Sequence, residues 1–399
     1  MTTLETTILG IIFENPFILA SAPPTASIES IDKAFDLGWG GAVLKTISPE
    51  NLEMKEASPR FTTLEFSHKT IGFQNIELLS HKKIADWCDG IKYLKEKHPT
   101  KVIIASIMAP VERSAWQSLV LQLNETPIDA FELNFSCPHG MPEKNIGMAI
   151  GTSAEISILI TSWVREVAKK PFFVKLTPNI TDITSIAKAV EIAGANGISA
   201  INTVQGFMGI DLETLEPKLN IDGKTTYGGC SGAFVKPIGL KCVSQIRKSS
   251  NLPILGIGGI STWEDAAEYI MVGSNAVQVC TGVMLNGYGI IDNLKNGLLE
   301  YMESKNFETI EDMRNLIVNK ITTHESLNKI DISYPNIDKD KCVKCGKCAQ
   351  ICSESGHKAM KMTRDGIEVL KNKCEGCSLC KYVCPKSAIY MSCSKITTA

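Results

Sequence analysis

The sequence lacks the features that would direct it to a membrane or out of the cell. No stretch approaches the roughly 18 uncharged apolar residues of a membrane helix, because Lys, Asp, Glu or Pro interrupts each long apolar run. The start carries Glu5 before a short apolar run, whereas a signal peptide has a basic start and a longer run. The formal net charge of −2 offers no polybasic surface. We therefore expect a cytoplasmic protein that binds neither nucleic acid nor membrane.

Glycine-rich nucleotide motifs are absent as well. The segments Gly256–Ser261 and Gly38–Gly41 both fail the G-x-G-x-x-G pattern of dinucleotide-binding folds. The segment Gly223–Thr225 lacks the earlier glycine of a phosphate-binding P-loop. Neither of these two kinds of nucleotide-binding loop is therefore expected in this chain.

A repeated alternation of apolar runs and helical segments fills most of the chain. From about residue 17 to residue 300, short runs rich in Val, Ile, Phe and Leu alternate with longer segments of helical period. The pattern is typical of a parallel sheet, and eight such units form a (β/α)8 TIM barrel. The expected strands are Phe17–Ser21, Ala42–Lys45, Val102–Ile107, Ala130–Phe135, Phe172–Leu176, Ile198–Asn202, Pro253–Ile257 and Ala276–Val279. Long loops follow three strands, at 46–79, 136–152 and 203–235, and indicate the catalytic face.

The pattern changes after residue 300. We expect a helical stretch to about Ile321, a polar connector through Asp340, and then eight cysteines within 43 residues. A chain of 399 residues exceeds what one hydrophobic core usually organises. We therefore place the barrel at 1–320 and a linker with a smaller α+β domain at 321–399.

Eight of the fourteen cysteines form two copies of the spacing C-x2-C-x2-C-x3-C. This spacing is typical of a ferredoxin-like domain with two [4Fe–4S] clusters, in which the fourth cysteine of each run reaches the other cluster. One predicted cluster is held by Cys342, Cys345, Cys348 and Cys384. The other is held by Cys374, Cys377, Cys380 and Cys352. Two zinc sites are the alternative, but zinc sites usually pair two C-x2-C motifs.

The segment Glu132–Gly140, at the end of the fourth expected strand, resembles a motif of the dihydroorotate dehydrogenases. The chain is most similar to the dihydropyrimidine dehydrogenases of that superfamily, whose bacterial catalytic subunit joins an FMN barrel to a two-cluster ferredoxin domain. The other stretches that carry the resemblance are Asn75–Leu78, Phe173–Asn179, Asn202–Val204, Thr225–Gly229, Ser231–Gly232 and Gly258–Ile260.

The resemblance implies an enzyme that reduces the 5,6 double bond of uracil or thymine. Electrons would pass from NAD(P)H through an FAD- and NAD-binding partner subunit and the clusters to FMN, in a homo- or hetero-oligomer. The resemblance also implies hydride transfer from FMN to C6 of the pyrimidine ring.

The residues that the resemblance assigns to FMN binding also suit that role on physical grounds. A fixed cation on the fifth strand, Lys175, can stabilise the negative charge of a reduced flavin without reorganisation. The Gly258–Ile260 loop, followed by a helix start, lies at the usual phosphate site of such barrels. A lysine snorkelling at the rim or a plain capped turn is the structural alternative. The expected FMN-binding residues are Ala20, Ser21, Lys45, Thr46, Asn75, Asn134, Lys175, Asn202, Ser231, Gly232, Gly258, Gly259 and Thr281.

Four polar residues, Asn75, Asn134, Asn202 and Thr203, stand at or beyond expected strand ends, where asparagine is a poor strand former. Carboxamides donate and accept hydrogen bonds at once, so a set of them can bind the N–H and C=O groups of a pyrimidine. Turn formation is the alternative for each asparagine. We predict that the four bind the substrate.

Cys137 follows the fourth expected strand and lies outside the cluster domain. A thiol with an ordinary pKa of about 8.5 is mostly protonated at pH 7 and can give a proton to C5 of the ring. A small buried hydrophobe is the alternative. We treat His139 as structural. Four other cysteines, Cys88, Cys230, Cys242 and Cys280, are treated as packing residues.

Two other functions stay open. A dihydroorotate dehydrogenase would oxidise a carboxylated ring, and that carboxylate would require further cationic or amide partners. An electron-carrier subunit with a catalytically silent barrel is the other possibility. Gln205 and Cys230 depart from the family pattern and leave the preference between uracil and thymine open.

Overall fold

The computed structural model describes residues 2–52, 55–135 and 148–394. The chain divides into two compact units, residues 1–320 and 321–399.

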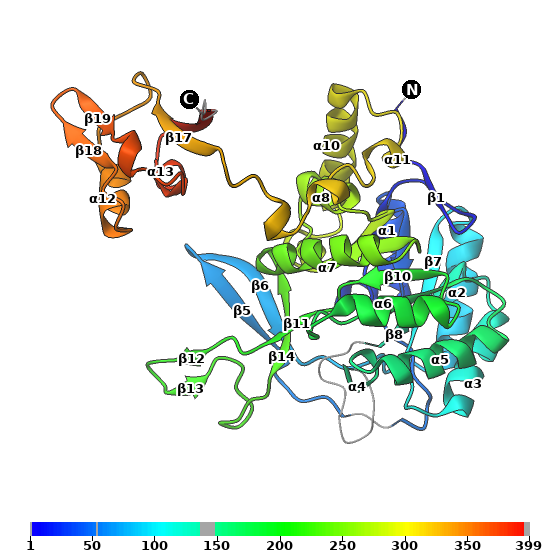
Figure 1. Cartoon of the computed structure of the whole chain (residues 1–399). Helices are drawn as coiled ribbons and strands as arrows, with labels where there is room; N and C mark the ends of the chain where they lie inside the picture. Colours follow the sequence, from blue (N-terminus) through cyan, green and yellow to red (C-terminus); the bar gives the residue numbers. More distant parts are fainter. Residues whose placement is uncertain (1, 53–54, 136–147, 395–399) are drawn as a thin grey trace. The chain divides into compact units, whose positions relative to one another are not determined.

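Eight parallel strands of the first unit close into a barrel (Figure 1). In chain order they are β3 (Phe17–Leu19), β4 (Gly41–Val43), β7 (Val102–Ile107), β8 (Ala130–Asn134), β9 (Phe172–Leu176), β10 (Gly197–Ala200), β15 (Ile254–Ile257) and β16 (Ala276–Val279). Strand β16 pairs with β3 and completes the ring. The predicted TIM barrel is confirmed, and each expected strand is found within a few residues of its predicted limits.

Helices cover the outside of the barrel (Figure 1). The larger ones are α1 (Ile28–Asp36), α2 (Ile84–Lys97), α3 (Arg113–Asn124), α5 (Ala154–Val167), α6 (Ile183–Ile192), α7 (Lys236–Ser249), α8 (Trp263–Met271) and α10 (Ile290–Lys305). The shorter ones are α4 (Met148–Gly151), α9 (Thr281–Asn286) and α11 (Ile310–Met313). In α3, residues Trp116, Leu119, Val120 and Leu123 are buried at helical spacing. Such a face packs each helix on the sheet.

A hairpin of β1 (Thr6–Ile8) and β2 (Ile11–Phe13) closes the N-terminal end of the barrel. Ile8 and Phe13 pack in one buried cluster with Ile18, Val102 and Ala130, which lie at or near the first positions of their strands. The opposite end of the strands therefore carries the cavity described below.

The segments after β4 and β10, expected to be loops, contain an antiparallel sheet. Strands β5 (Phe61–Phe66), β6 (Lys69–Asn75), β11 (Val204–Gly206) and β14 (Gly228–Gly232) form it in the order β11-β14-β6-β5. A separate hairpin joins β12 (Ile210–Asp211) to β13 (Glu216–Pro217). The alternation of apolar and polar residues in Thr63–Phe66 is short and lies outside the barrel repeat, so the sequence analysis missed these strands.

The second unit is a small α+β domain, as predicted (Figure 1). Strand β17 (Ile332–Ile337) pairs with β20 (Ile389–Ser394), and β18 (Met360–Thr363) pairs with β19 (Gly366–Val369). Its helices are α12 (Lys347–Glu354) and α13 (Leu379–Tyr382). The helical stretch expected to about Ile321 is interrupted: α10 ends at Lys305, where Asn306 adopts a left-handed cap, and α11 and a 3-10 turn at Val318–Lys320 follow. The polar connector contains a strand, β17, that the sequence analysis did not expect.

Among the described residues, no helix combines the length and the apolar character needed to cross a membrane.

Candidate functional site

A cavity of about 1030 Å³, part of it open to solvent, lies at the C-terminal ends of the barrel strands. Its size suits a small-molecule ligand. Residues from the predicted set that line it are Ala20, Ser21, Lys45, Thr46, Asn75, Asn134, Lys175, Asn202, Thr203, Ser231, Gly258, Gly259 and Thr281. Of the rest, Gly232 is absent from the lining, and Cys137 and His139 lie outside the described residues. Each side of the cavity thus comes from a different strand end.

Two lysines of the cavity are held by carboxylates. Lys175, 4% exposed, extends from β9, and its Nζ lies 3.2 Å from Oε1 of Glu132, which is fully buried on β8. The other oxygen of Glu132 accepts a hydrogen bond of 2.7 Å from the Gln278 amide. Lys45, just after β4, pairs with Glu77 at 2.7 Å. A buried charge requires such pairing, since burial of an unpaired ion is costly.

The asparagines form part of a connected polar network. The Asn134 amide donates to the Thr46 hydroxyl at 3.0 Å and accepts from the Asn202 amide at 3.3 Å. The Asn75 amide donates to the carbonyl of Gly229 on the neighbouring strand β14 at 3.1 Å. Thr203 N–H in turn donates to Oδ1 of Asn202 at 2.8 Å. These bonds fix the carboxamides, so a ligand would meet preoriented donors and acceptors.

Gly258 and Gly259 form a tight loop after β15. Both adopt positive φ, +127° and +74°, and a Cβ on Gly259 would lie 2.8 Å from the carbonyl oxygen of Gly232. The buried hydroxyl of Tyr269 donates to the Gly258 carbonyl at 2.7 Å. Nearby, the Thr281 hydroxyl donates to Ser231 at 2.9 Å. Gly232 therefore supports the loop by close packing, although it does not line the cavity.

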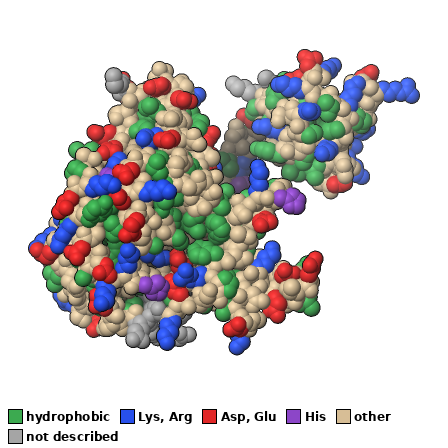
Figure 2. Space-filling view, turned by 180° about the vertical axis from the view of Figure 1, so that it is seen from behind, with side chains coloured by type: hydrophobic (Ala, Val, Ile, Leu, Met, Phe, Trp, Pro, Cys, Tyr) green, Lys and Arg blue, Asp and Glu red, His purple; other side chains and the backbone are tan. Residues whose placement is uncertain are grey.

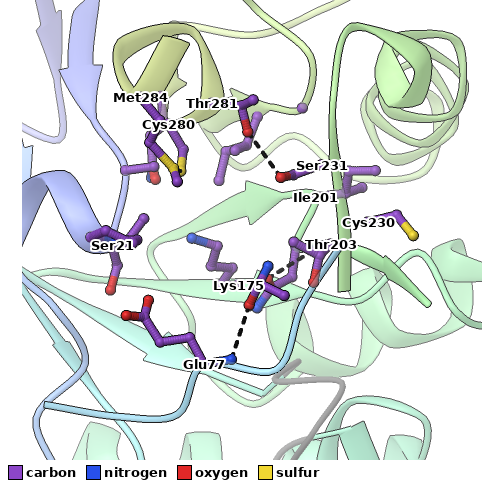
Figure 3. Close-up of a pocket in the computed structure, with 18 of the residues that line it drawn as sticks. Ser21, Glu77, Lys175, Ile201, Thr203, Cys230, Ser231, Cys280, Thr281 and Met284 are labelled. Carbon is purple, nitrogen blue, oxygen red and sulfur yellow. Dashed lines mark hydrogen bonds between the residues drawn. The ribbon is translucent and has the colours of Figure 1, made fainter. Parts of the chain in front are cut away.

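Two cysteines treated as packing residues also line the cavity, Cys230 and Cys280. The Cys280 sulfur lies 3.7 Å from that of Met284, one turn along α9 (Figure 3). Burial raises the pKa of Cys280 to about 11, although the nearby Lys175 and Lys45 oppose the rise. Burial also raises the pKa of Cys230. Both thiols are therefore protonated near neutral pH.

Sequence reasoning missed Glu77, Glu132 and Gln278. Glu77 and Glu132 stood within quoted motif stretches, but their roles depend on lysines distant in sequence. Gln278 is a polar residue inside the apolar strand β16, a signal that could have been used. Its Oε1 is buried and lacks a hydrogen-bond partner among the described residues.

The second unit holds two smaller cavities, each surrounded by four cysteines. Cys342, Cys345, Cys348 and Cys384 line one of about 360 Å³. Cys352, Cys374, Cys377 and Cys380 line one of about 340 Å³. The sulfur of the fourth cysteine in each run accepts a backbone N–H: Ala359 donates to Cys352 at 3.2 Å, and Ala388 donates to Cys384 at 3.3 Å. Helix α12 thus contributes Cys348 to the first cavity and Cys352 to the second, and α13 contributes Cys380 to the second.

Comparison with known families assigns both units. The sequence model described as "Dihydroorotate dehydrogenase" matches residues 3–302, three quarters of the chain. This chain belongs to the dihydroorotate dehydrogenase family. A second model, described as "4Fe-4S dicluster domain", matches residues 335–391. The resemblance noted in the sequence is therefore confirmed.

Three relatives are similar to this chain over most of its length. A chloroplastic dihydropyrimidine dehydrogenase (NADP(+)) of Arabidopsis thaliana is 40% identical over 338 residues, 82% of this chain and 79% of the relative. The NAD-dependent dihydropyrimidine dehydrogenase subunit PreA of Escherichia coli is 40% identical over 362 residues, 90% and 87% of the two chains. A dihydroorotate dehydrogenase B (NAD(+)) catalytic subunit of Pyrococcus horikoshii is 34% identical over 310 residues, 78% and 96%.

The residues present fit a flavin and two clusters. Gln278 offers a buried acceptor to a ring N–H, since its Oε1 lacks a protein partner among the described residues. In the second unit, the buried apolar cluster itself includes the cysteines Cys348 and Cys380. So small a core is typical of domains that a metal group helps to stabilise.

Proposed function

We propose that this chain is the catalytic subunit of a dihydropyrimidine dehydrogenase, which reduces uracil or thymine to the 5,6-dihydropyrimidine. Two relatives that are 40% identical carry this activity in their names. The observation that carries the proposal is the cavity, where Asn75, Asn134, Asn202 and Thr203 surround the same space as the buried Lys175. A site rich in fixed carboxamides suits a ring with alternating N–H and C=O groups.

The proposed cofactors are FMN in the barrel cavity and two [4Fe–4S] clusters in the second unit. Bound FMN would supply hydride chemistry to the pyrimidine ring. The clusters would bring single electrons to the FMN. Lys175, held by Glu132, would offer a fixed positive charge to the flavin ring. The Gln278 side-chain oxygen would accept a hydrogen bond from an N–H group of the flavin. The Gly258–Gly259 loop, Ser231 and Thr281 hold its phosphate.

The chain's own residues would bind the ring and move one proton. The asparagines and Thr203 orient the pyrimidine through bonds that need no reorganisation, since the Asn134 and Asn202 amides are already joined. Cys137 is proposed as the acid that donates a proton to C5. It follows Asn134 by three residues in the sequence.

We further propose that NAD(P)H electrons reach the clusters through an FAD- and NAD-binding partner subunit. The Escherichia coli relative is named as a subunit of an NAD-dependent enzyme, which supports such a partner. The assembly would be a homo- or hetero-oligomer in the cytoplasm, where a reducing environment keeps cysteine ligands available.

A half-reaction tests the proposal without the partner. The full chain, prepared without oxygen, is assayed for FMN and iron, reduced with dithionite and mixed with uracil. We expect flavin absorption to return and dihydrouracil to form. Protein that lacks flavin, or keeps it reduced in the presence of uracil, would contradict the proposal and favour an electron-carrier role.

A second candidate function is dihydroorotate dehydrogenase activity. The observation that favours it is the family model, which covers the whole barrel. The same half-reaction with orotate in place of uracil separates the two candidates, because only one ring is expected to reoxidise the flavin quickly.

A further inference from the structure

An ion pair, Lys45 and Glu77, stands in the wall of the barrel cavity. Nζ of Lys45 lies 2.7 Å from Oε2 of Glu77, and the two side chains are only 10% and 14% exposed. Lys45 follows β4, whereas Glu77 follows β6 of the antiparallel sheet, one of the two strands between β4 and β7 in the chain. Figure 3 shows the Glu77 side chain turned into the space between Ser21 and Lys175. The carboxylate therefore belongs to the ligand space.

Local bonds hold Glu77 in this position. Its backbone N–H donates to Oδ1 of Asn75 at 3.3 Å, and the Asn75 amide is itself fixed by the Gly229 carbonyl at 3.1 Å. Asn75 is one of the residues proposed to bind the pyrimidine. The carboxylate of Glu77 is thus fixed beside the proposed ring site.

The Lys45–Glu77 ion pair also affects the net charge of the cavity wall around a ligand. Lys175 is the other cation among the described residues that line the cavity, and it is paired with Glu132 at 3.2 Å. Every lysine in this described lining therefore has a carboxylate partner. A ligand carboxylate would have to compete with Glu77 for Lys45 and would lie near a like charge, in a partly buried site where repulsion is poorly screened.

We propose that Glu77 selects the substrate by charge. Its carboxylate neutralises Lys45 and repels a second carboxylate, so the cavity accepts an uncharged pyrimidine and rejects a carboxylated one such as orotate. The inference rests on the proposed function, because it assumes that a pyrimidine ring binds beside Asn75. It names Glu77 as the residue that separates this chain from an enzyme of carboxylated pyrimidines.

The test measures ligand binding to the flavin-loaded full chain, not turnover. Dissociation constants of uracil and orotate are obtained by calorimetry for the wild type and for Glu77→Gln. We expect the ratio of the two constants to shift at least tenfold toward orotate in Glu77→Gln, because Lys45 becomes available to the ligand carboxylate. Glu77→Asp keeps the charge and should keep the wild-type preference.

Two further variants make the result specific. Glu65→Gln, at an exposed position of β5, changes the net charge equally and should leave the ratio unaltered. Adding Lys45→Met to Glu77→Gln should abolish the gain for orotate. The flavin absorption of each variant shows that it is folded.

An unshifted ratio in Glu77→Gln, or a gain that persists without Lys45, overturns the role of Glu77 while the proposed function stands. A wild type that binds neither ring overturns the proposed function, and the role of Glu77 with it. A wild type that prefers orotate overturns the selection by charge.

Discussion

We expect two thiols of the barrel unit, Cys137 and Cys280, to differ in their chemistry. Cys137 is proposed to give up a proton in each turnover, whereas Cys280 sits in the cavity with a pKa raised to about 11 by burial. A general acid works best when its pKa lies near the operating pH. Cys280 is therefore a poor acid, and the two residues should respond differently to substitution and to pH.

Replacement of Cys137 by alanine tests the acid directly. Cys137→Ala should bind pyrimidine normally but turn over at least about a hundredfold more slowly, the lower end of the scale on which general acid catalysis contributes. Steady-state kinetics with uracil, together with a binding titration, check this. Turnover that is undiminished would remove Cys137 from the mechanism.

Alkylation against pH tests Cys280. Because the thiolate is the nucleophile, a pKa of about 11 predicts slow reaction with iodoacetamide at pH 8 and a rate that rises about tenfold per pH unit up to pH 10. Mass spectrometry of the Cys280 peptide follows the reaction, with the exposed Cys393 as the reference. A Cys280 rate that equals that of Cys393 at pH 8 would contradict the prediction.

At the scale of elements, what could be predicted depended on the burial of each strand. All eight barrel strands were found from sequence because fully buried strands are continuous apolar runs, as in Val102–Ile107. Strand β5 was missed because it is not buried: Thr62 is half-buried and Glu65 is exposed. The motif residues of the cavity were located through the family resemblance. The partners of Lys45 and Lys175 were not, because each ion pair joins segments over 30 residues apart.

The helix α12 connects the two cysteine-lined cavities. Cys348 and Cys352 lie one turn apart on it, yet Cys348 lines the first cavity and Cys352 the second. Cys352→Ala should therefore lower the iron content by about four atoms per chain and leave the flavin in place. Iron analysis after anaerobic purification checks this, with Cys393→Ala as the control. Unchanged iron in Cys352→Ala would refute the ligand role.

At the scale of the whole molecule, charge is unevenly divided. Residues 321–399 contain thirteen Lys or Arg against eight Asp or Glu, whereas residues 1–320 contain 28 against 35. Figure 2 shows Lys and Arg side chains on the visible face of the smaller unit. Cluster thiolates would offset part of this charge, but exposed lysines such as Lys344 and Lys386 line the first cysteine cavity. An acidic electron donor would be attracted to this unit.

Such attraction should be screened by salt. We expect the second-order rate of electron delivery from the proposed partner subunit to fall at least about tenfold between roughly 0.05 and 0.5 M NaCl, as the Debye length shortens. Stopped-flow reduction of the flavin by the NADH-charged partner measures it. Reoxidation by uracil is the control, because an uncharged ligand should be insensitive to salt. A flat dependence of electron delivery would contradict electrostatic docking.

The hairpin of β1 and β2 limits how ligands can enter and leave the barrel. Since Ile8 and Phe13 seal one end of the barrel, small molecules must enter and leave by the mouth at the other. A cofactor bound deep in the cavity would have to bind before the substrate and remain bound. Each substrate would then bind only after the previous product had left through the same opening.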